Sequence, residues 1–561
     1  MVMLTARLNA ILRSSWRCLA LAFACGIALA LVVQPDRAMA QADDSQYDPP
    51  ARVGRVAYIS GAVSYHTLDM DHWEPAVLNY PVAAGDSYWT EPGARTAIEI
   101  GHGVLRLDGS TEADVQQLDD TIVQVNLVQG SINFRLRRVW QGERYEILTP
   151  SGTVVITIPG RYHIDAFADG RPANIVVIEG SAAIVGQATS FTIAAGQASA
   201  VVMNGPPPRA AFRTTEIDTW SDQQEARFAA VPDYVSPEIP GINDVAGVGE
   251  WGRSPDYGTI WYPPVAANWA PYRYGHWAFV APWGWTWVDD APWGFAPFHY
   301  GRWVQVRERW GWVPGEVVQR PVYAPALVVF IGGPAVSIGV SAGPVAAWIP
   351  LGPREVYVPP YRTSINYVRN VNVTNVTNVT TINNTTINNI TVNRTANNFV
   401  NASATTVVPA ATMSNSTPVA RAAVRVPPQG MERAPVTREA PVKPSLATRG
   451  ATPAVVQAVG GAATAVPQRP NAPGPAVKSK PLPPERLRPI APAAGGAPSG
   501  APGSSPPATP TPSGATPPAP AGSQADKKKE ADTKKGDNTK KSGTPAPAGA
   551  PTPAPAAPSA P

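Results

Sequence analysis

The sequence is poor in charge and in cysteine. Only 15% of its 561 residues are charged and the formal net charge is +4, so the chain lacks a strong field that would steer nucleic acid or an acidic substrate towards it. We therefore expect no nucleic-acid partner. Both cysteines, Cys18 and Cys25, lie near the N-terminus, which leaves the rest of the chain without a disulfide, a thiolate nucleophile or a thiolate metal ligand.

The first 40 residues have the composition of a secretory signal peptide. Arginines up to Arg17 precede an apolar run over 18–33, and Ala38-Met39-Ala40 provides small residues for cleavage before Gln41. A linker, 41–51, follows. The alternative is an inner-membrane anchor formed by uncleaved residues 18–33, a run shorter than the roughly 20 residues that a spanning helix needs. We expect an exported protein of the periplasm or cell envelope, with peripheral membrane association as a further option.

Residues 52–205 show the pattern of an all-β domain. Short runs rich in Val, Ile and Thr alternate with turn signals, for example 153–158 before Pro159-Gly160 and 174–178 before Glu179-Gly180. Short strands at this spacing, with no long amphipathic helix between them, predict a β-sandwich or a wound β-sheet.

The order of the turns in this region resembles the FecR-type periplasmic domain of bacteria. The matching pieces are Trp73 to Pro81, Gly85-Asp86-Ser87 with Thr90, 97–100, Val128-Gln129-Gly130, Leu148-Thr149-Pro150, Pro159-Gly160-Arg161-Tyr162, Val177-Ile178-Glu179-Gly180 and Ala195-Gly196-Gln197. The resemblance implies a domain that senses or relays a signal in the envelope and does not catalyse. Sigma-regulating members carry a cytoplasmic segment and a membrane helix before this domain, whereas this chain shows only the signal sequence, so a direct anti-sigma role is not expected.

Residues 206–233 are predicted to be a linker with a short helix. The stretch TTEIDTWSDQQEARFAA (214–230) offers Thr and Asp caps together with apolar Ile217, Trp220 and Phe228. We expect this helix to pack on one of its neighbours.

Tryptophan is concentrated in an internal repeat within residues 234–365. PYRYGHW (271–277) returns as PFHYGRW (297–303), and each copy is followed by a second aromatic element, at 283–288 and 310–314. One unit therefore predicts a β-hairpin, and two hairpins would stack into one aromatic sheet. Strand alternation places Trp277 with Phe279 on one face of the first strand, and Trp285 with Trp287 on one face of the second.

Two interpretations of these tryptophans are open. They form the core of a small β-module, since each Trp can bury about 150–250 Å², or one face stays exposed as a stacking platform for sugar rings or a peptide. Burial is the commoner fate, and both hold if the two faces divide the work. The candidate ligand-stacking residues are Trp277, Trp285, Trp287, Trp303, Trp310 and Trp312.

With its flanks, the same region resembles a family of Trp/Tyr/Pro-rich domains of unknown function that follow FecR-like domains in exported bacterial proteins. The stretches that carry this resemblance are YVSPEIPGINDVAGVGEW, IWYPPV, WGWTWVDDAPWGFAPFHYGRW, WGWVPG and AAWIPLGPREVYVPPY. The resemblance implies no chemistry.

Two short stretches contain residues that catalysis could use. Asp289-Asp290 lies beside the tryptophans, and carboxylates near a stacking surface would suit glycoside hydrolysis, but adjacent residues in a turn point apart and turn formation explains them. Gly339-Val340-Ser341-Ala342-Gly343 has the spacing of a nucleophile elbow, yet His299 is the last histidine and precedes it. We expect no catalytic residue and no cofactor.

The histidines do not have the spacing of a metal site. They are His66, His72, His102, His163, His276 and His299, and none falls in a close ligand motif. His66 and His72 with Asp69 and Asp71 are the nearest approach to one, and loop solvation explains them. We expect no metal.

The C-terminal part has two predicted regions. Residues 366–404 are rich in Asn and Thr with an apolar residue every third position, a period that fits neither strand nor helix. Residues 405–561 are rich in Pro, Ala and Gly and almost lack aromatic residues, so we expect a disordered tail.

Three functions are compatible with these features. The first is a non-enzymatic exported envelope protein whose aromatic module binds a cell-wall glycan or an envelope protein. The second is a sensing component of a FecR-type regulatory relay. The third is a wall-acting glycoside hydrolase that uses Asp289 or Asp290. The absence of a catalytic motif and the aromatic repeat favour the first.

Overall fold

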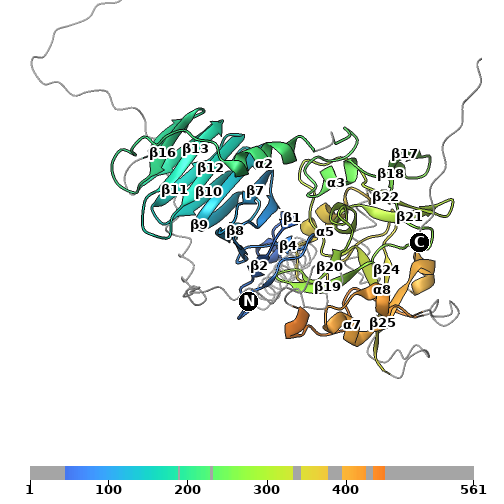
Figure 1. Cartoon of the computed structure of the whole chain (residues 1–561). Coiled ribbons are helices and arrows are strands. Elements are labelled where there is room, and N and C mark those ends of the chain that lie inside the picture. Colours follow the sequence, from blue (N-terminus) through green and yellow to red (C-terminus); the bar gives the residue numbers. More distant parts are fainter. Residues whose placement is uncertain are drawn as a thin grey trace, which may run out of the picture. The chain divides into compact units, whose positions relative to one another are not determined.

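The chain is all-β, as the sequence predicts. The computed structural model describes residues 44–186, 190–227, 231–332, 343–376, 395–424 and 434–448. The predicted signal peptide, Ser341 and residues 449–561 lie outside the described residues. In the described part, strands predominate over short helices (Figure 1), and none of the helices there has the length and apolarity needed to cross a membrane.

The first sixteen strands form what we call the β-domain. After the short 3-10 helix η1 (Asp44–Tyr47), they are β1 (Gly54–Ser60), β2 (Val63–His66), β3 (Glu74–Pro75), β4 (Pro81–Val82), β5 (Ser87–Thr90), β6 (Arg95–Ile100), β7 (Gly103–Leu107), β8 (Glu112–Leu118), β9 (Ile122–Leu136), β10 (Arg144–Thr149), β11 (Gly152–Ile156), β12 (Gly160–Ala166), β13 (Ala173–Glu179), β14 (Ser181–Val185), β15 (Ser190–Ala194) and β16 (Gln197–Val201). Nearly all neighbours pair antiparallel, whereas β9 and β10 pair in parallel.

The long strand β9 joins the two sheets of the β-domain. Its first half pairs with β8 and β10, and its second half pairs with β7 and β12. Gly130 lies where β9 passes from one sheet to the other. Its φ is 96°, and a Cβ there would lie 2.3 Å from Thr111 Oγ1. Only glycine fits this position, so the Val128-Gln129-Gly130 turn is where the chain passes from one sheet to the other.

The core of the β-domain follows from strand alternation. Along β9 the buried apolar side chains are Val123, Val125, Leu127, Ile132, Phe134 and Leu136. They belong to one large hydrophobic cluster with residues of both sheets. The two sheets therefore enclose a common core, as expected for a sandwich or wound sheet.

Helix α2 (Glu216–Glu225) packs on the β-domain. A capping box between Thr215 and Asp218 fixes its start. Ile217 and Trp220 lie in a small apolar cluster with Ala97 and Val104 of the sheet. The helix predicted within the linker is therefore present, and it is a packed part of the β-domain.

The remaining elements form what we call the aromatic domain. They are α3 (Ile242–Ala246), β17 (Glu250–Ser254), β18 (Gly258–Tyr262), β19 (Gly275–Val280), β20 (Gly284–Asp289), α4 (Ala296–His299), β21 (Arg302–Val306), β22 (Arg309–Val313), β23 (Val328–Ile331), β24 (Val345–Pro350), α5 (Ile365–Asn372), η3 (Ala396–Asn398), η4 (Ala402–Ala404), β25 (Thr406–Pro409), α7 (Ala410–Ser414), α8 (Val419–Ala422), β26 (Val436–Thr437) and η6 (Leu446–Thr448).

The two repeat hairpins do not share a sheet, which corrects the prediction of a single aromatic sheet. β19 and β20 form a two-stranded sheet, whereas β21 and β22 belong to a four-stranded sheet in the order β17-β18-β22-β21. The extra strands come from residues before the first repeat copy, a non-local pairing that the repeat pattern does not encode.

The folded chain also extends beyond residue 404, which corrects the predicted start of the disordered tail. β25 and β26 flank the hairpin β23–β24 in a second four-stranded sheet, in the order β25-β24-β23-β26. Val407, Val408, Met413 and Val419 are buried there. These few apolar side chains are outweighed by Pro, Ala and Thr in a composition average, although they suffice to pack the segment onto an existing sheet.

The start of the Asn/Thr-rich segment is helical. α5 contributes Tyr367, Val368 and Val371 to the interior, and Ser364 Oγ accepts a hydrogen bond from the Tyr367 amide as its N-cap. The three-residue period that begins at 366 therefore does not describe α5, which packs against its neighbours; the rest of this stretch up to 394 lies mostly outside the described residues.

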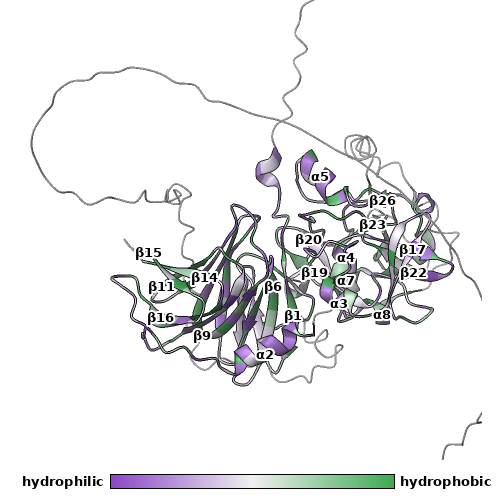
Figure 2. Cartoon of the chain, turned by 90° about the horizontal axis from the view of Figure 1, so that it is seen from above, coloured by the Kyte–Doolittle hydropathy of each residue, from purple (hydrophilic) through white to green (hydrophobic). Residues whose placement is uncertain are grey.

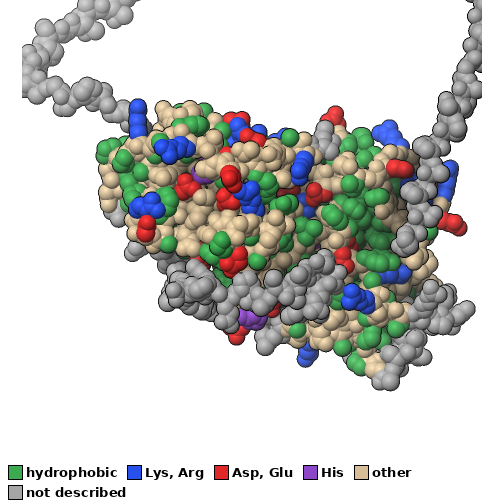
Figure 3. Space-filling view, in the orientation of Figure 1, with side chains coloured by type: hydrophobic (Ala, Val, Ile, Leu, Met, Phe, Trp, Pro, Cys, Tyr) green, Lys and Arg blue, Asp and Glu red, His purple; other side chains and the backbone are tan. Residues whose placement is uncertain are grey.

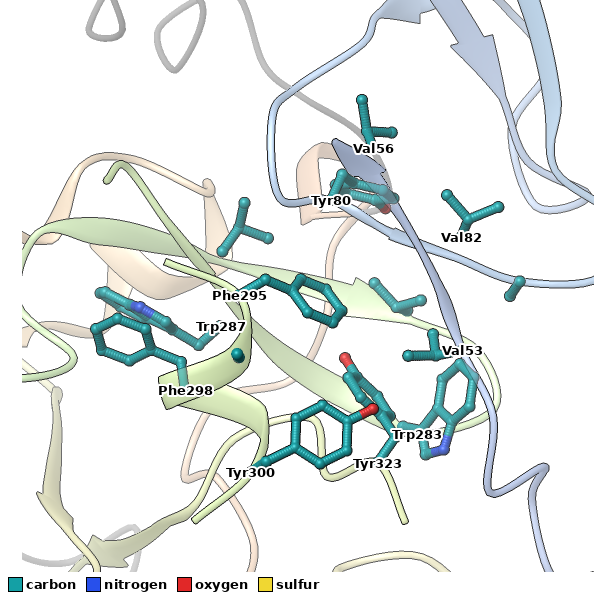
Figure 4. Close-up of a cluster of buried hydrophobic side chains, with 14 of the residues drawn as sticks. Val53, Val56, Tyr80, Val82, Trp283, Trp287, Phe295, Phe298, Tyr300 and Tyr323 are labelled. Atoms are coloured by element: carbon teal, nitrogen blue, oxygen red, sulfur yellow. The ribbon is translucent and has the colours of Figure 1, made fainter. Parts of the chain in front are cut away.

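Apolar side chains of both domains meet in one cluster. Figure 4 shows Val53, Val56, Tyr80 and Val82 of the β-domain close to aromatic side chains of the aromatic domain, which are Trp283, Phe295, Tyr300 and Tyr323. Burial of such aromatic area is a large favourable term. The junction between the two domains is therefore part of the core.

Candidate functional site

The two repeat copies form hairpins with the same register. Trp277 lies opposite Trp287 in β19–β20, and Trp303 lies opposite Trp312 in β21–β22. The rings of Trp277 and Trp287 are 5.5 Å apart in an edge-to-face arrangement, which suits the charge distribution of aromatic rings.

A second cross-strand pair lies nearer each turn, and here the hairpins differ. Phe279 lies opposite Trp285 in the first hairpin, with ring centroids 5.8 Å apart. Gln305 lies opposite Trp310 in the second. The predicted alternation of Trp277 with Phe279 and of Trp285 with Trp287 agrees with these registers.

Five of the six candidate ligand-stacking tryptophans are buried. The buried ones are Trp277, Trp287, Trp303, Trp310 and Trp312, and each is at most 7% exposed. Trp285 is half-buried, and its Nε1 donates to the Val442 carbonyl at 3.0 Å. A ring enclosed on both faces has no surface for a sugar, so Trp285 is the candidate whose position suits contact with a ligand.

A row of four tryptophans crosses the sheet of the second hairpin. Trp251, Trp261, Trp312 and Trp303 are register partners on β17, β18, β22 and β21. The ring centroids of Trp261 and Trp312 are 6.5 Å apart, and those of Trp251 and Trp312 are 6.3 Å apart. The row is a packed ladder, which makes the core interpretation the better one for this sheet.

The glycine shared by both repeat copies makes room for these rings. A Cβ on Gly275 would lie 2.7 Å from Cζ2 of Trp287, and one on Gly301 would lie 2.3 Å from Nε1 of Trp312. Trp312 Nε1 donates to the Tyr300 carbonyl at 2.8 Å. The repeat therefore combines a tryptophan with a glycine because the indole must lie against the backbone of the neighbouring strand.

Asp289 ends β20 and is buried, and it holds the turn that follows, as the turn interpretation of the sequence expects. Its Oδ2 accepts from Trp287 Nε1 at 3.0 Å and its Oδ1 accepts from the Ala291 amide at 3.0 Å. Burial raises its pKa well above the usual range. Burial also raises the pKa of Asp290. Both oxygens of Asp289 thus serve the structure of the hairpin.

The repeat places a basic residue before each inner tryptophan. The fold gives these two residues, Arg302 and His276, different surroundings. Arg302 is buried and donates to the carbonyls of Gly301 and Glu355 and, at 2.8 Å, to Asn372 Oδ1 of α5. Burial lowers its pKa to about 10. His276 is equally buried, and within the described residues neither ring nitrogen has a hydrogen-bond partner. Burial lowers the pKa of His276 to about 4, so it is neutral near pH 7.

His299 lies at a small cavity. Its Nδ1 donates to the Ala324 carbonyl at 2.9 Å, which leaves the unprotonated Nε2 as an acceptor with no partner in the described part of the chain. Burial lowers the pKa of His299 to about 4. The cavity, lined also by Ser236, Glu316 and Thr374, measures about 20 Å³, which is room for about one water molecule.

A buried arginine connects the β-domain to the aromatic domain. Arg55 Nε donates to Glu99 Oε2 at 2.8 Å, and its Nη2 is paired with Asp244 of α3. The Gly241 amide donates to the same Glu99 oxygen at 2.8 Å. Burial opposes ionisation of Glu99, but the charge of Arg55 and these hydrogen bonds keep its pKa below the usual range.

Asn79 extends this network to the first hairpin. Its Oδ1 accepts from Arg55 Nη1 at 3.1 Å, and its Nδ2 donates to the carbonyls of Asp289 and Ala291 at 3.1 and 2.7 Å. Removing one partner would leave buried polar groups unsatisfied, which costs more than the bond itself contributes. The network therefore fixes the β-domain against the end of β20.

A second buried network fixes α2 on the β-domain. His163 Nδ1 lies 2.9 Å from Asp218 Oδ1, and its Nε2 lies 3.0 Å from Asp165 Oδ1. Burial by itself lowers the pKa of His163, but hydrogen bonds to the two carboxylates raise it to about 9. His163 is therefore a buried cation near pH 7, in contrast to His276.

The remaining predicted positions do not converge. His72 is solvent-exposed and contacts Asp71 and Glu74, while the ring of His66 packs on Trp73 at 5.6 Å. In the part of the chain that the structure covers, no group of three His, Cys, Asp or Glu is arranged to hold a metal ion.

Sequence reasoning missed the junction residues Arg55, Asn79, Glu99 and Asp244. Their partners lie far apart in the chain, up to 212 residues for Asn79 and Ala291, so no local spacing marks them. The one available signal is a charged residue inside an apolar strand pattern, since Arg55 interrupts β1 and Glu99 interrupts β6.

One family model matches part of the chain. Residues 242–355 match the model of a family of unknown function, DUF6600, which confirms the predicted domain of unknown function in this region. The comparison with curated proteins gives no match.

Two solved structures are also similar, both of a candidate anti-sigma factor from Parabacteroides distasonis ATCC 8503. The crystal structure at 2.50 Å shares 14% identity and covers 24% of this chain and 63% of that chain, and the one at 1.65 Å shares 12% identity and covers 27% and 68%. Both have a TM-score of 0.22, which is too low to carry an argument. The FecR-type resemblance of residues 52–205 thus stays a prediction.

Proposed function

We propose that this chain is a non-enzymatic, exported envelope protein that binds an envelope glycan or protein through the turn end of the first hairpin. The observation that carries the proposal is the position of Trp285. It is the one half-buried member of the six candidate residues, and its neighbour Phe279 is also half-buried. A Trp and a Phe held edge to face present apolar rings without further ordering cost.

The contacts of Trp285 support a binding role. The hydrogen bond from its Nε1 to the Val442 carbonyl fixes the indole plane, and β20 holds its backbone against β19. A stacking platform needs a ring of fixed orientation, because a mobile ring loses side-chain entropy on binding. Trp277 and Trp287, the inner pair of the same hairpin, hold it in the core.

The hydrogen bonds of the acidic side chains support the proposal that the chain is not an enzyme. Asp289 uses both carboxyl oxygens within the hairpin, and Asp165 and Asp218 pair with His163. If the chain were a hydrolase that uses Asp289 or Asp290, Asp289→Asn or Asp290→Asn would abolish turnover of wall glycan. We expect no turnover by the parent chain.

Binding is tested with the full chain and isolated cell-wall sacculi in a sedimentation assay. We expect Trp285→Ala to weaken binding at least about tenfold, because an anchor ring at the centre of an interface contributes more than about 1 kcal/mol. Tyr262→Ala is the matched control. Tyr262 is another half-buried aromatic residue, in the small apolar cluster of Ile260, Val304 and Val313, and Figure 3 shows hydrophobic side chains gathered in the area of β18, β21 and β22.

Each result is decisive. Loss of binding in Trp285→Ala alone supports the proposal. Equal binding by the parent chain and Trp285→Ala, or loss in Tyr262→Ala alone, contradicts it. If membrane fractions compete with sacculi for the parent chain, the partner is a membrane component instead of the wall.

A second candidate function, relay of a signal from the β-domain to the aromatic domain, is favoured by the Arg55 network. A relay needs a connection that transmits a change, and Arg55 contacts both Glu99 and Asp244. Transcript profiles of a deletion strain test this function: a defined regulon restored by the parent chain and not by Arg55→Met supports it, whereas an unchanged profile excludes it.

A further inference from the structure

A segment from late in the chain lies on the first hairpin. It begins after β26, which pairs with β23 through Val436 opposite Ile331 and Thr437 opposite Phe330, and Figure 2 shows these two strands side by side. We call the residues that follow β26, 438–448, the strap. The end of the strap, η6, contacts β19 and α7. The strap therefore runs from the sheet of β23 and β24 to the first hairpin of the repeat.

Both ends of the strap are held by hydrogen bonds. Just before it, the Gly332 amide donates to the Pro435 carbonyl at 2.8 Å. At its end, Ser445 Oγ donates to the Ser414 carbonyl of α7. Thr448 is buried, and its Oγ1 donates to the Ser445 carbonyl at 2.7 Å and accepts from the Ser445 amide at 3.1 Å. Ser445 thus connects the strap to α7.

The middle of the strap contacts Trp285. Trp285 Nε1 donates to the Val442 carbonyl at 3.0 Å, and Ala440, Val442 and Trp285 all pack against the same large hydrophobic cluster. Pro441 and Pro444 have no amide hydrogen, and the ladder of β26 ends at the residue before the strap. A carbonyl of the strap therefore takes its donor from a side chain, and the indole of Trp285 is that donor for Val442.

Two other indole N–H groups of the repeat have partners within the repeat itself. Trp287 donates to Asp289, two residues later, and Trp312 donates to the Tyr300 carbonyl. Trp285 instead donates to a residue 157 positions later, and within the described residues this is its one hydrogen bond. Because its ring is half-buried, the core does not enclose it as it encloses the inner tryptophans. The orientation of this indole therefore depends on the strap.

We propose that the strap is a positioning element for the binding site: the Val442 carbonyl orients the indole of Trp285, and Ser445 is the positioning residue that holds the strap on α7. A ring already held in one orientation loses less side-chain entropy when a partner binds. The affinity of the site is thus set by a segment 157 residues away in the sequence. The effect on affinity rests on the proposed function, whereas the orientation of the ring does not depend on it.

Fluorine NMR of the full chain labelled with fluorotryptophan tests the orientation of the ring. The resonance of Trp285 is the one that Trp285→Phe removes. We expect Ser445→Ala to shift or broaden this resonance, because the strap loses its hydrogen bond to α7 and the indole samples further orientations. Ser414→Ala is the matched control, since it removes a hydroxyl from α7 and keeps the carbonyl that Ser445 contacts. Neither Ser414→Ala nor Ser445→Thr, which keeps the hydroxyl, should change the resonance, and circular dichroism verifies that all variants keep the fold.

Sedimentation with cell-wall sacculi tests the effect on affinity. We expect Ser445→Ala to weaken binding by the full chain about threefold, since the ring must then be ordered when the partner binds. Trp285→Phe keeps an aromatic ring but lacks the indole N–H, so it should weaken binding to a similar extent. In the Trp285→Phe chain, Ser445→Ala should have no further effect. A purely structural role of Ser445 would not depend on the indole in this way.

The results separate the role of the strap from the proposed function. An unchanged Trp285 resonance in Ser445→Ala overturns the positioning role, as does an equal loss of binding from Ser445→Ala in the parent and Trp285→Phe chains. Stronger binding by Ser445→Ala would mean that the strap obstructs the site, which also overturns it. If the resonance responds to Ser445→Ala while the parent chain binds no sacculi, the strap orients the ring and the proposed function fails.

Discussion

The two hairpins of the repeat have the same inner tryptophan pair but different solutions for the basic residue beside it. Arg302 is a buried cation with hydrogen bonds to α5 and to the Glu355 carbonyl. His276 is buried and neutral, and the described residues offer its ring nitrogens no partner. The repeat thus determines the hairpin, while the surrounding elements determine the charge that the hairpin can hold.

The largest effect is expected at the feature that the hairpins share. Trp277→Ala and Trp303→Ala should each lower the free energy of unfolding by about 3–5 kcal/mol, because each leaves a large cavity in the core. Trp285→Ala is the control within the first hairpin and should cost about 1 kcal/mol or less, since its ring is half-buried. Urea unfolding followed by circular dichroism measures all three. A comparable loss in Trp285→Ala would show that the hairpin end is as much core as the inner pair.

The next effect separates the two basic positions. Arg302→Met should cost about 3 kcal/mol, because Asn372 Oδ1 and two carbonyls lose their donor in a buried site. His276→Met should cost less than about 1 kcal/mol, since no hydrogen bond is lost. Urea unfolding at neutral pH compares them. In an Asn372→Ala background the cost of Arg302→Met should fall, and additive costs would contradict the proposed coupling of hairpin and α5.

The hairpins should also differ in their response to acid. The pKa of His276 is about 4 in the folded chain against 6.5 for a free side chain, so the unfolded state binds more protons between these values and stability falls as pH falls from 6.5 to 4. At pH 5 this amounts to about 2 kcal/mol. His276→Leu should remove this loss, leaving the similar one from His299. Arg302→Met, measured against the same pH series, should keep the full acid slope.

In the β-domain, His163 gives the free energy of unfolding a pH dependence of the opposite sign. Because the pKa of His163 is raised to about 9, its contribution is fully present below 6.5 and is lost as pH rises through 9. A pH series of unfolding in His163→Leu should therefore lack the loss of stability at alkaline pH and keep the loss at acid pH.

The prediction for His276 has its own contradicting outcome. If His276→Leu leaves the loss of stability between pH 6.5 and 4 unchanged, the imidazole ring of His276 has a hydrogen-bond partner in the native chain.

The smallest effect on stability is expected at the second cross-strand pair of each hairpin, the pair nearer the turn. Gln305→Phe would give the second hairpin the Phe–Trp pair that the first has at Phe279 and Trp285. Because Gln305 is exposed and lies opposite Trp310, we expect a gain of about 0.5 kcal/mol from the aromatic pair. Thermal unfolding measures this. Gln305→Leu serves as the control for added apolar area without an aromatic ring.

Much of the local structure was predictable. The repeat gave both hairpins, and the alternation of Trp277 with Phe279 gave the correct pairing faces, because side-chain direction along a strand has a period of two. The capping residues Thr215 and Asp218 predicted α2 for an equally local reason. The Val-Gln-Gly turn was recognisable, although its role at the change between sheets was not.

The candidate site was less predictable. Six tryptophans were equivalent in the sequence, and only their burial distinguishes Trp285 from the rest. Asp289 was predicted to form a turn, and its hydrogen bond from the Ala291 amide does so, but the sequence did not show that it is buried or that Trp287 donates to it. Burial depends on which distant segments cover a residue, and strand periodicity carries no information about that.

The sequence by itself determined the all-β class, the two hairpins and the positions of the glycines against which the indoles pack, since these follow from side-chain alternation and from steric limits on the backbone. Only the tertiary structure decided that the hairpins belong to different sheets, that residues 406–409 and 436–437 complete the separate sheet of β23 and β24, and that Arg55 connects the domains. Those features depend on contacts between segments far apart in the chain, where the free energy of burial selects a partner that no local pattern specifies.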